Sequence, residues 1–369
     1  MNEGNINSRR RVAVVLFNVG GPDNLAAVRP FLYNLFSDPA IITLPAGIRH
    51  FLAGLLAWRR APVARAIYKL IGGKSPIAAG TRAQAAALEK KLNTDAPEKA
   101  GKTEFRCFTS MRYWHPRAQQ TVREVREFAP DDIVLLPLFP QYSTTTVGTA
   151  LDEWSRAARA AKLDVPTHAC CCYPLEEGVI EAHTAAIAKT IEKKIGDKPF
   201  RLLLSAHSLP QKTIDAGDPY VWQIDQTVDR LMKRLREETG RGNIDYRVCY
   251  QSRVGPLKWL EPNTQSEIRR AGAEGLALIV VPIAFVSEHL ETLVELDIEY
   301  AKLATEAGVP LYCRMPALGT DERFIEALSK ITLRRLGSGK CGSASSDAGE
   351  RICPAGFAKC HQKPGPEEV

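Results

Sequence analysis

Two segments of the chain carry side chains that can move protons or bind a metal ion. The first is Ser205–Pro210, which reads Ser-Ala-His-Ser-Leu-Pro and follows an apolar run typical of a buried strand. His207 is therefore expected at the rim of a sheet, and a neutral imidazole is the natural proton acceptor near pH 7. A lone histidine also commonly has only a structural role, so both interpretations stay open for this segment alone.

The second segment is a row of carboxylates that starts where another apolar run ends. The row consists of Glu288, Glu291, Glu295 and Glu299. Steps of three, four and four residues place these acids on one face of a helix, with Ser287 as the expected N-cap. No basic residue interrupts the row before Lys302. Crowded carboxylates raise some of their pKa values and can pass protons or hold a divalent cation loosely. The alternative is an ordinary solvated helix face.

Other catalytic motifs are absent from the sequence. It has no Gly-x-Ser-x-Gly, no His-Glu-x-x-His and no Cys-x-x-Cys. Any metal ion is therefore expected to be bound transiently, by few fixed ligands, rather than held permanently. Gly72–Ser75 resembles a phosphate-binding loop, but its spacing fails and Pro76 follows at once. We therefore expect no nucleotide cofactor. Gly20-Gly21-Pro22 is either a close approach of backbone to a ligand or simply a tight turn.

Composition indicates a soluble globular protein with room for two domains. The chain has 369 residues, of which 45% are hydrophobic and 25% charged. The net charge of +7 suits an anionic small molecule or membrane surface, and no basic run with interleaved aromatics points to nucleic acid. Nine cysteines without a pairing pattern, and no signal peptide, favour a reducing cytosol.

Strand-like apolar runs alternate with segments of helical period. Strands are predicted at 12–18, 105–109, 133–138, 167–172, 201–205, 246–250, 276–282 and 310–314. Helices are predicted at 78–92, 116–128, 176–194, 221–238 and 288–306. This alternation is typical of doubly wound α/β layers with parallel sheets covered on both faces.

The sequence also resembles itself. Phe-Arg followed by Ser at the same offset occurs twice, at Phe105-Arg106 with Ser110 and at Phe200-Arg201 with Ser205. A second pair of similar segments begins at Ile133 and at Leu278. We therefore predict two related Rossmann-like domains, each with a parallel four-stranded sheet, at 11–165 and 166–336. Residues 1–10 form a polar extension, and 337–369 form a polar tail that contains cysteines. The cleft between the halves is the expected ligand site.

The motifs resemble one family closely. Ser205–Pro210, the Tyr250-Gln-Ser-Arg-Val-Gly-Pro-x-x-Trp259 run and Ser287–Asp297 together look like the ferrochelatases, which insert ferrous iron into a porphyrin. The resemblance extends from about Val12 to Leu336. It implies two Rossmann-like domains, which agrees with the internal echo.

The resemblance also implies residue roles. His207 matches the pocket histidine and Glu291 the key carboxylate, with His289 and Glu295 continuing a polar path. Both His207 and Glu291 are implied ligands of the substrate iron. Porphyrin-contacting positions carry over to Val19, Arg59, Arg60, Tyr68, Ser75, Arg112, Tyr113, Trp259 and Phe285. Because Val19 stands where coproporphyrin-using relatives have Tyr, protoporphyrin IX is the expected substrate.

Residues 44–60 match the apolar lip of the family's pocket. Phe51, Leu55 and Trp58 with the neighbouring arginines fit a shallow insertion into a membrane surface, and a buried helix is the alternative. We expect a cytoplasmic protein peripherally associated with the inner membrane.

Some members of the family carry a [2Fe–2S] cluster bound by cysteines of a C-terminal extension and one cysteine of the body. Here Cys341, Cys353 and Cys360 supply three candidate ligands, and one of Cys170, Cys171 and Cys172 would be the fourth. Thr144 lies where the animal-type internal ligand would be, and the Cys353–Cys360 spacing looks closer to bacterial forms.

The predicted function is insertion of Fe²⁺ into protoporphyrin IX. The expected partners are that porphyrin, Fe²⁺ as substrate, a membrane surface and a second copy of the chain, with no nucleic acid. The alternatives are a chelatase for coproporphyrin III or for another tetrapyrrole or metal, and a porphyrin carrier that performs no chemistry.

Overall fold

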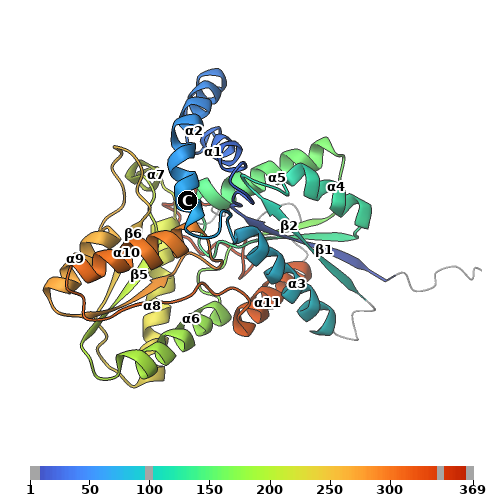
Figure 1. Ribbon diagram of the computed structural model, residues 1–369. Coiled ribbons are helices and arrows are strands. Elements are labelled where there is room, and N and C mark those ends of the chain that lie inside the picture. Colours follow the sequence, from blue (N-terminus) through green and yellow to red (C-terminus); the bar gives the residue numbers. More distant parts are fainter. Residues whose placement is uncertain (1–8, 96–102, 339–344, 363–369) are drawn as a thin grey trace, which may run out of the picture.

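The strands form two all-parallel sheets side by side in the computed structural model, which describes residues 9–95, 103–338 and 345–362 (Figure 1). The first sheet has the order β2-β1-β3-β4-β9. It contains β1 (Arg11–Asn18), β2 (Glu104–Met111), β3 (Asp132–Pro137), β4 (Thr167–Cys172) and β9 (Ser345–Ser346). The second has the order β6-β5-β7-β8. It contains β5 (Phe200–His207), β6 (Tyr246–Gln251), β7 (Ala277–Pro282) and β8 (Tyr312–Arg314).

All eight strands predicted from the sequence are confirmed. Each sheet places its second strand first and its first strand second, followed by its third and fourth, so the two halves share one topology. This common order agrees with the internal echo of the sequence. The central strands β1, β3 and β7 are almost entirely apolar and buried, as sheets covered on both faces require, whereas the edge strand β2 is mixed.

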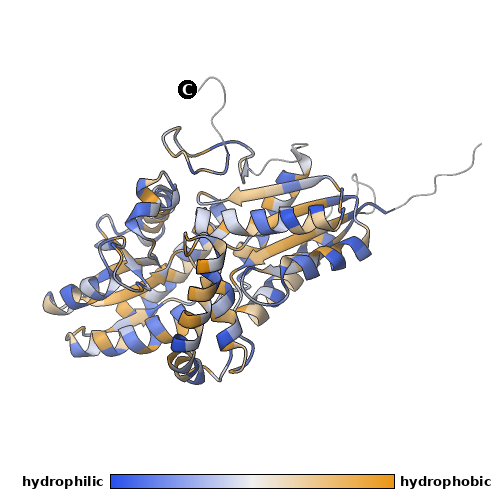
Figure 2. Cartoon of the chain, turned by 90° about the horizontal axis from the view of Figure 1, so that it is seen from above, coloured by the Kyte–Doolittle hydropathy of each residue, from blue (hydrophilic) through white to orange (hydrophobic). Residues whose placement is uncertain are grey.

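The helices cover both faces of each sheet. They are α1 (Val28–Phe36), α2 (Ala46–Lys69), α3 (Ile77–Asp95), α4 (Ala118–Phe128), α5 (Thr149–Ala160), α6 (Glu177–Thr190), α7 (Gln211–Asp215), α8 (Tyr220–Thr239), α9 (Thr264–Ala273), α10 (Tyr300–Glu306) and α11 (Glu322–Gly337). Three π-helical segments are η2 (Thr144–Gly148), η3 (Ile191–Ile195) and η4 (Glu291–Glu299). Figure 2 shows the strands largely apolar and the helices divided between polar and apolar stretches. The apolar helix faces thus bury the sheets.

The expected domain boundary at 165/166 needs correction. Strand β4 pairs with β3, so the first sheet includes residues as far as Cys172. Helix α11 packs Phe324 and Leu328 into the same core as Val14 and Leu88 of the first sheet and α3. The chain therefore passes between the two halves twice. The internal sequence similarity could not reveal this, because that similarity concerns only the strand ends.

The polar tail also needs correction. Its residues 345–346 add β9 to the edge of β4, and Cys353 is buried. Phe357 packs beside Trp222 of α8, with ring centroids 5.9 Å apart, and the Lys359 amide donates to the Gly217 carbonyl. The described part of the tail thus contacts both halves of the molecule.

A buried histidine of α6 should make the protein sensitive to acid. His183 is 3% exposed, its Nε2 has no hydrogen-bond partner among the described residues, and burial lowers its pKa from 6.5 to about 4. Below about pH 6.5 the unfolded chain binds the proton more strongly, so the free energy of unfolding falls as the pH drops towards 4. The full difference is about 3 kcal/mol. Urea titrations should show that loss, and His183→Gln should remove most of it.

The exposed His115 provides the matched control, because His115→Gln should leave the pH dependence of stability unchanged. Equal acid-induced losses in the His183→Gln variant and the parent would contradict the assignment.

Candidate active site

His207 and Glu291 form an ion pair between the end of β5 and the start of η4. Nδ1 of His207 lies 2.8 Å from Oε2 of Glu291, and Nε2 of His289 lies 3.7 Å from the same oxygen. The His207 and Glu291 side chains are 36% and 32% exposed, so solvent and a substrate can reach them. The structure therefore brings together three of the four residues of the expected polar path around one carboxylate oxygen.

Each member of the pair shifts the pKa of the other. Burial acts against ionisation of Glu291, but the neighbouring His207 outweighs it and lowers the pKa of the carboxyl to about 2. Burial likewise acts against protonation of His207, but the Glu291 carboxylate outweighs it and raises the pKa of the imidazole. For His289 burial prevails and lowers the pKa. The site thus combines an ionised carboxylate, an imidazole whose pKa that carboxylate raises, and a second imidazole whose pKa burial lowers.

The carboxylate row differs from the expected free row. Glu288 accepts from the Arg314 guanidinium at 2.6 Å and from the Ala317 amide, and Arg314 also pairs with Asp297. The sequence places no basic residue among these acids before Lys302. Arg314, which pairs with Glu288, belongs to the separate strand β8. Glu288 is therefore neutralised through a tertiary contact, whereas burial and the Glu291 charge still raise the pKa of Glu295.

The helix start also differs. The regular helix begins at Glu291 as a π-helix, and Ser287 is not its N-cap. Instead Ser287 donates to Oε1 of Gln84 in α3, and Gln84 donates to the Val286 carbonyl. Ser287 thus links the two halves. π-Helical turns are rare and frequently mark functional sites.

Aromatic residues surround the ion pair. The Phe285 ring lies 4.5 Å from that of His289 and 6.3 Å, edge-on, from that of His207. Tyr68 is buried at the end of α2. Burial raises its pKa most, and the Glu291 carboxylate raises it further. Trp259 is partly buried and bridges Pro210 just beyond His207. Phe285 therefore lies beside the pair, Tyr68 lies close enough for the Glu291 charge to raise its pKa, and the backbone bridge places Trp259 next to the segment that follows His207.

Arg112 and Tyr113 are placed differently from the expected substrate contacts. The Arg112 guanidinium lies 2.6 Å from Asp38 and 3.1 Å from Glu153, and the Tyr113 hydroxyl donates to Asp38. Both side chains are largely buried in this network, which ties the residues after α1 to the end of β2. Their side-chain contacts are therefore structural.

The remaining predicted contacts lie on the first half. Val19 is partly buried at the end of β1, Ser75 is buried before α3, and Arg59 and Arg60 are exposed on α2. Sequence reasoning assigned no role to Asn18, whose buried amide reaches Thr81 at 3.0 Å and Ser287 at 3.4 Å. Its position at a strand end was the available signal.

Helix α2 projects from the body beyond both sheets (Figure 1). Phe51 is 76% exposed and Trp58 60% exposed, so the buried-helix alternative for residues 44–58 is wrong. Among the described residues no helix is both long and apolar enough to cross a bilayer.

The tail cysteines meet those of β4. Gln223 donates to Cys172 at 3.4 Å and to Cys353 at 3.2 Å, and a hydrogen bond from Cys353 lowers the pKa of Cys360 to about 6. Cys171 lies 3.5 Å from Cys172, whereas Cys341 falls outside the described residues. Within the described ranges no group of three or more His, Cys, Asp or Glu side chains is arranged to hold a metal ion. The thiols here do not form a complete ligand set.

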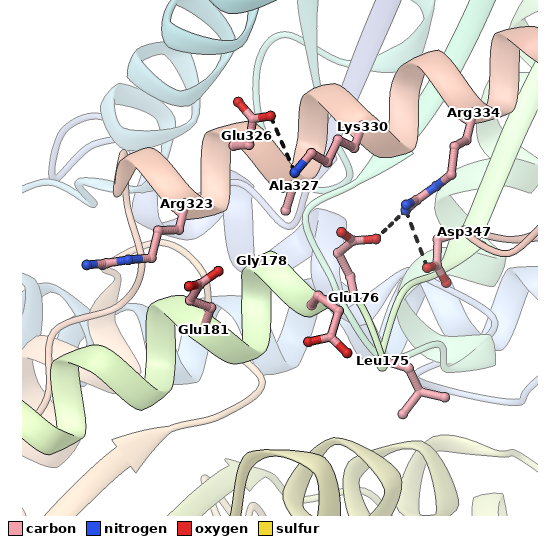
Figure 3. A pocket seen from close by; sticks show the side chains of 11 residues that line it. Leu175, Glu176, Gly178, Glu181, Arg323, Glu326, Ala327, Lys330, Arg334 and Asp347 are labelled. Carbon is pink, nitrogen blue, oxygen red and sulfur yellow. Dashed lines mark hydrogen bonds and ion pairs between the residues drawn. The ribbon is translucent and has the colours of Figure 1, made fainter. Parts of the chain in front are cut away.

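A cavity of about 460 Å³ lies away from this site, between α6 and α11. Its charged groups largely satisfy one another: Arg334 pairs with Glu176 and Asp347, and Lys330 with Glu326 (Figure 3). Glu177 and Glu181 of the lining pair instead with Arg230 and Arg234 of α8, so these carboxylates are also engaged by the protein itself.

Known proteins resemble the chain over nearly its whole length. The ferrochelatase family model matches residues 11–336. The ferrochelatase of Phenylobacterium zucineum (strain HLK1) is 52% identical over 350 residues, covering 95% of this chain and 97% of the relative. That of Caulobacter vibrioides (strain NA1000 / CB15N) is 48% identical over 356 residues, covering 96% and 99%.

The crystal structure of the sirohydrochlorin chelatase SirB from Bacillus subtilis subspecies spizizenii, in complex with cobalt, shares the fold. It superimposes with a TM-score of 0.52 at 11% identity, covering 89% of this chain and 97% of that one. Two Rossmann-like halves are thus common to both chains. Together with the family match, the relatives show that this chain belongs to the ferrochelatase family, the enzymes that insert iron into porphyrin in haem synthesis.

Proposed function

We propose that the protein inserts Fe²⁺ into protoporphyrin IX, with the His207–Glu291 pair as its reaction centre. The observation that carries this proposal is the 2.8 Å ion pair at the end of β5, reachable from solvent and surrounded by aromatic side chains. Insertion replaces two pyrrole N–H bonds by bonds to iron and releases two protons. The site must therefore accept protons and handle a divalent cation in one place.

The residue types fit these tasks. His207, in its neutral form and hydrogen-bonded to Glu291, accepts each pyrrole proton in turn as general base and passes it to the solvent that reaches its partly exposed side chain. Glu291 and His289 offer one carboxylate and one neutral imidazole as transient ligands for the incoming Fe²⁺. Aromatic walls from Phe285, Trp259 and Tyr68 grip the flat macrocycle, and binding energy from those walls supplies the distortion that exposes its nitrogen lone pairs.

An anaerobic assay tests the substrate directly. Fe²⁺ insertion into protoporphyrin IX and coproporphyrin III is measured side by side, and protoporphyrin IX should give the higher kcat/KM. Val19, without a hydroxyl to meet an additional propionate, supports that preference. A higher kcat/KM for coproporphyrin III would reverse the substrate assignment and leave the reaction class intact.

We also propose that α2 docks on a membrane surface. The exposed Phe51 and Trp58, with Arg59 and Arg60 beside them, suit the boundary between acyl chains and anionic headgroups. Replacing both aromatics with serine should weaken binding to anionic vesicles by at least about tenfold, because each buried aromatic contributes about 1.5–3 kcal/mol. Vesicle co-sedimentation measures the change. Unchanged binding by the double variant would contradict the docking.

The remaining finer predictions are a [2Fe–2S] cluster, a homodimer and a cytoplasmic location at the inner membrane. Gln223 bonds both Cys172 and Cys353, and Cys353 bonds Cys360, which supports a thiolate site. Protein purified without air should be red-brown if the cluster is present. Colourless, iron-free protein would remove that prediction.

A further inference from the structure

Both carboxylate oxygens of Glu295 accept hydrogen bonds. Its Oε1 accepts from the Ser252 amide at 2.8 Å and from the Tyr300 hydroxyl at 2.6 Å. Its Oε2 accepts from the Ser252 hydroxyl and from Nε2 of Gln251 at 3.2 Å. Four donors occupy about the four acceptor sites that a carboxylate offers. A metal ion could bind Glu295 only after one of these contacts broke, whereas burial and the Glu291 charge raise the pKa of the carboxyl.

Gln251 connects this carboxylate to the reaction centre. It is 1% exposed and lies opposite His207 in the ladder between β5 and β6. The same Nε2 that donates to Glu295 also donates to the backbone carbonyl of Glu291 at 3.1 Å. On its other side, Oε1 of Gln251 accepts from the Ser205 hydroxyl at 2.8 Å, which fixes the orientation of the amide. One side chain therefore spans both elements that carry the ion pair.

The residue after Gln251 has a strained backbone conformation that keeps it in contact with Glu295. Ser252 has φ of 66°, in the left-handed region that non-glycine residues rarely adopt. In that conformation both its amide and its hydroxyl reach Glu295. Strained backbone of this kind persists where the surrounding contacts over-determine it, and it clusters at functional sites.

We infer that Gln251 and Glu295 are positioning residues that fix the π-helical turn bearing Glu291 against His207, and that Glu295 does not itself bind the metal. The inference rests on the proposed role of the His207–Glu291 pair and revises the expected metal path by ending it at Glu291. Gln251 supplies the donor both to Glu295 and to the Glu291 carbonyl, so this contact can be removed without changing an ionisable group.

The test removes the acceptor and the donor separately. Glu295→Gln sets two amide donors against each other, and Gln251→Glu sets two carboxylates against each other. Gln251→Leu removes the donor to both Glu295 and the Glu291 carbonyl without changing an ionisable group. Each variant should lower kcat by about 10- to 100-fold, since small misplacements of reacting groups cost that much. The KM for the porphyrin should stay within about twofold, because no substrate contact is removed.

The outcomes separate this inference from the proposed function. Wild-type kcat in Gln251→Leu together with an inactive Glu295→Gln would overturn the inference, because a conduit needs only the carboxylate at position 295. Wild-type kcat in all three variants would overturn it as well, even where His207→Ala is inactive. Activity in His207→Ala would instead refute the proposed reaction centre. Gln120→Glu makes the same chemical change on the exposed face of α4 and should leave kcat unchanged.

Discussion

Replacing His207 with alanine is expected to abolish iron insertion while the variant still binds porphyrin. The imidazole is the proton acceptor paired with Glu291, and removing a positioned general base typically lowers rates by about 10²- to 10⁴-fold. The aromatic side chains that contact the macrocycle remain, so affinity should change far less than kcat. Anaerobic turnover gives kcat, and porphyrin fluorescence gives the dissociation constant.

This variant also distinguishes an enzyme from a porphyrin carrier. A carrier needs apolar walls but no base, so it would work equally well without the imidazole. The control is the thermal unfolding midpoint, which should barely move because the His207 side chain is about one-third exposed and, within the described part of the chain, forms a side-chain hydrogen bond to Glu291 alone. Full turnover in a folded His207→Ala protein would show that the base lies elsewhere.

The sequence predicted the strands well because burial on both faces leaves continuous apolar runs that resemble little else. Strand β4, for example, was predicted as residues 167–172 and is observed there. Helix α11 illustrates the opposite case, since its residues follow the second sheet in the chain but pack onto the first. No local pattern states which sheet an amphipathic helix covers, so the boundary at 165/166 could not be corrected from sequence.

The reaction centre was predictable in its residues but not in its contacts. His207 and Glu291 stand at the ends of apolar runs, and parallel strands bring such ends to one edge. Their mutual distance, the π-helix and the pairing of Glu288 with Arg314 depend on elements far apart in the chain. Spacing alone therefore suggested a free row of acids, whereas tertiary partners divide that row into differently bonded groups.

Arg112 shows how a resemblance can identify a residue and leave its physical role open. Its guanidinium is 10% exposed and pairs with Asp38 and Glu153, which are 1% and 7% exposed. Glu153 also pairs with Arg117 at 2.6 Å, and Asp38 accepts from the Tyr113 hydroxyl at 2.9 Å. The network joins the residue that follows α1 to β2 and α5, and so fixes the base from which α2 extends.

Breaking this network should be one of the most destabilising single changes in the protein. Asp38→Asn removes the negative charge and leaves the buried Arg112 with Glu153 as its remaining carboxylate. Removing one partner of a buried pair costs about 3–5 kcal/mol, a large share of the roughly 5–15 kcal/mol that holds a domain folded. Urea denaturation measures the loss. Asp197→Asn, at a fully exposed side chain, should stay within about 0.5 kcal/mol of the parent.

A double-mutant cycle decides whether Arg112 acts through Asp38. If its role is structural, Asp38→Asn combined with Arg112→Met should cost less than the sum of the single losses, with a coupling of about 1–3 kcal/mol. The expected reason is that the double variant leaves no uncompensated charge between the two positions. If the losses of unfolding free energy are strictly additive, and Arg112→Met alone raises the KM for porphyrin, Arg112 instead contacts the substrate. In the first case the family's arginine contributes to catalysis only indirectly, by holding α2 beside the site that its Tyr68 helps to enclose.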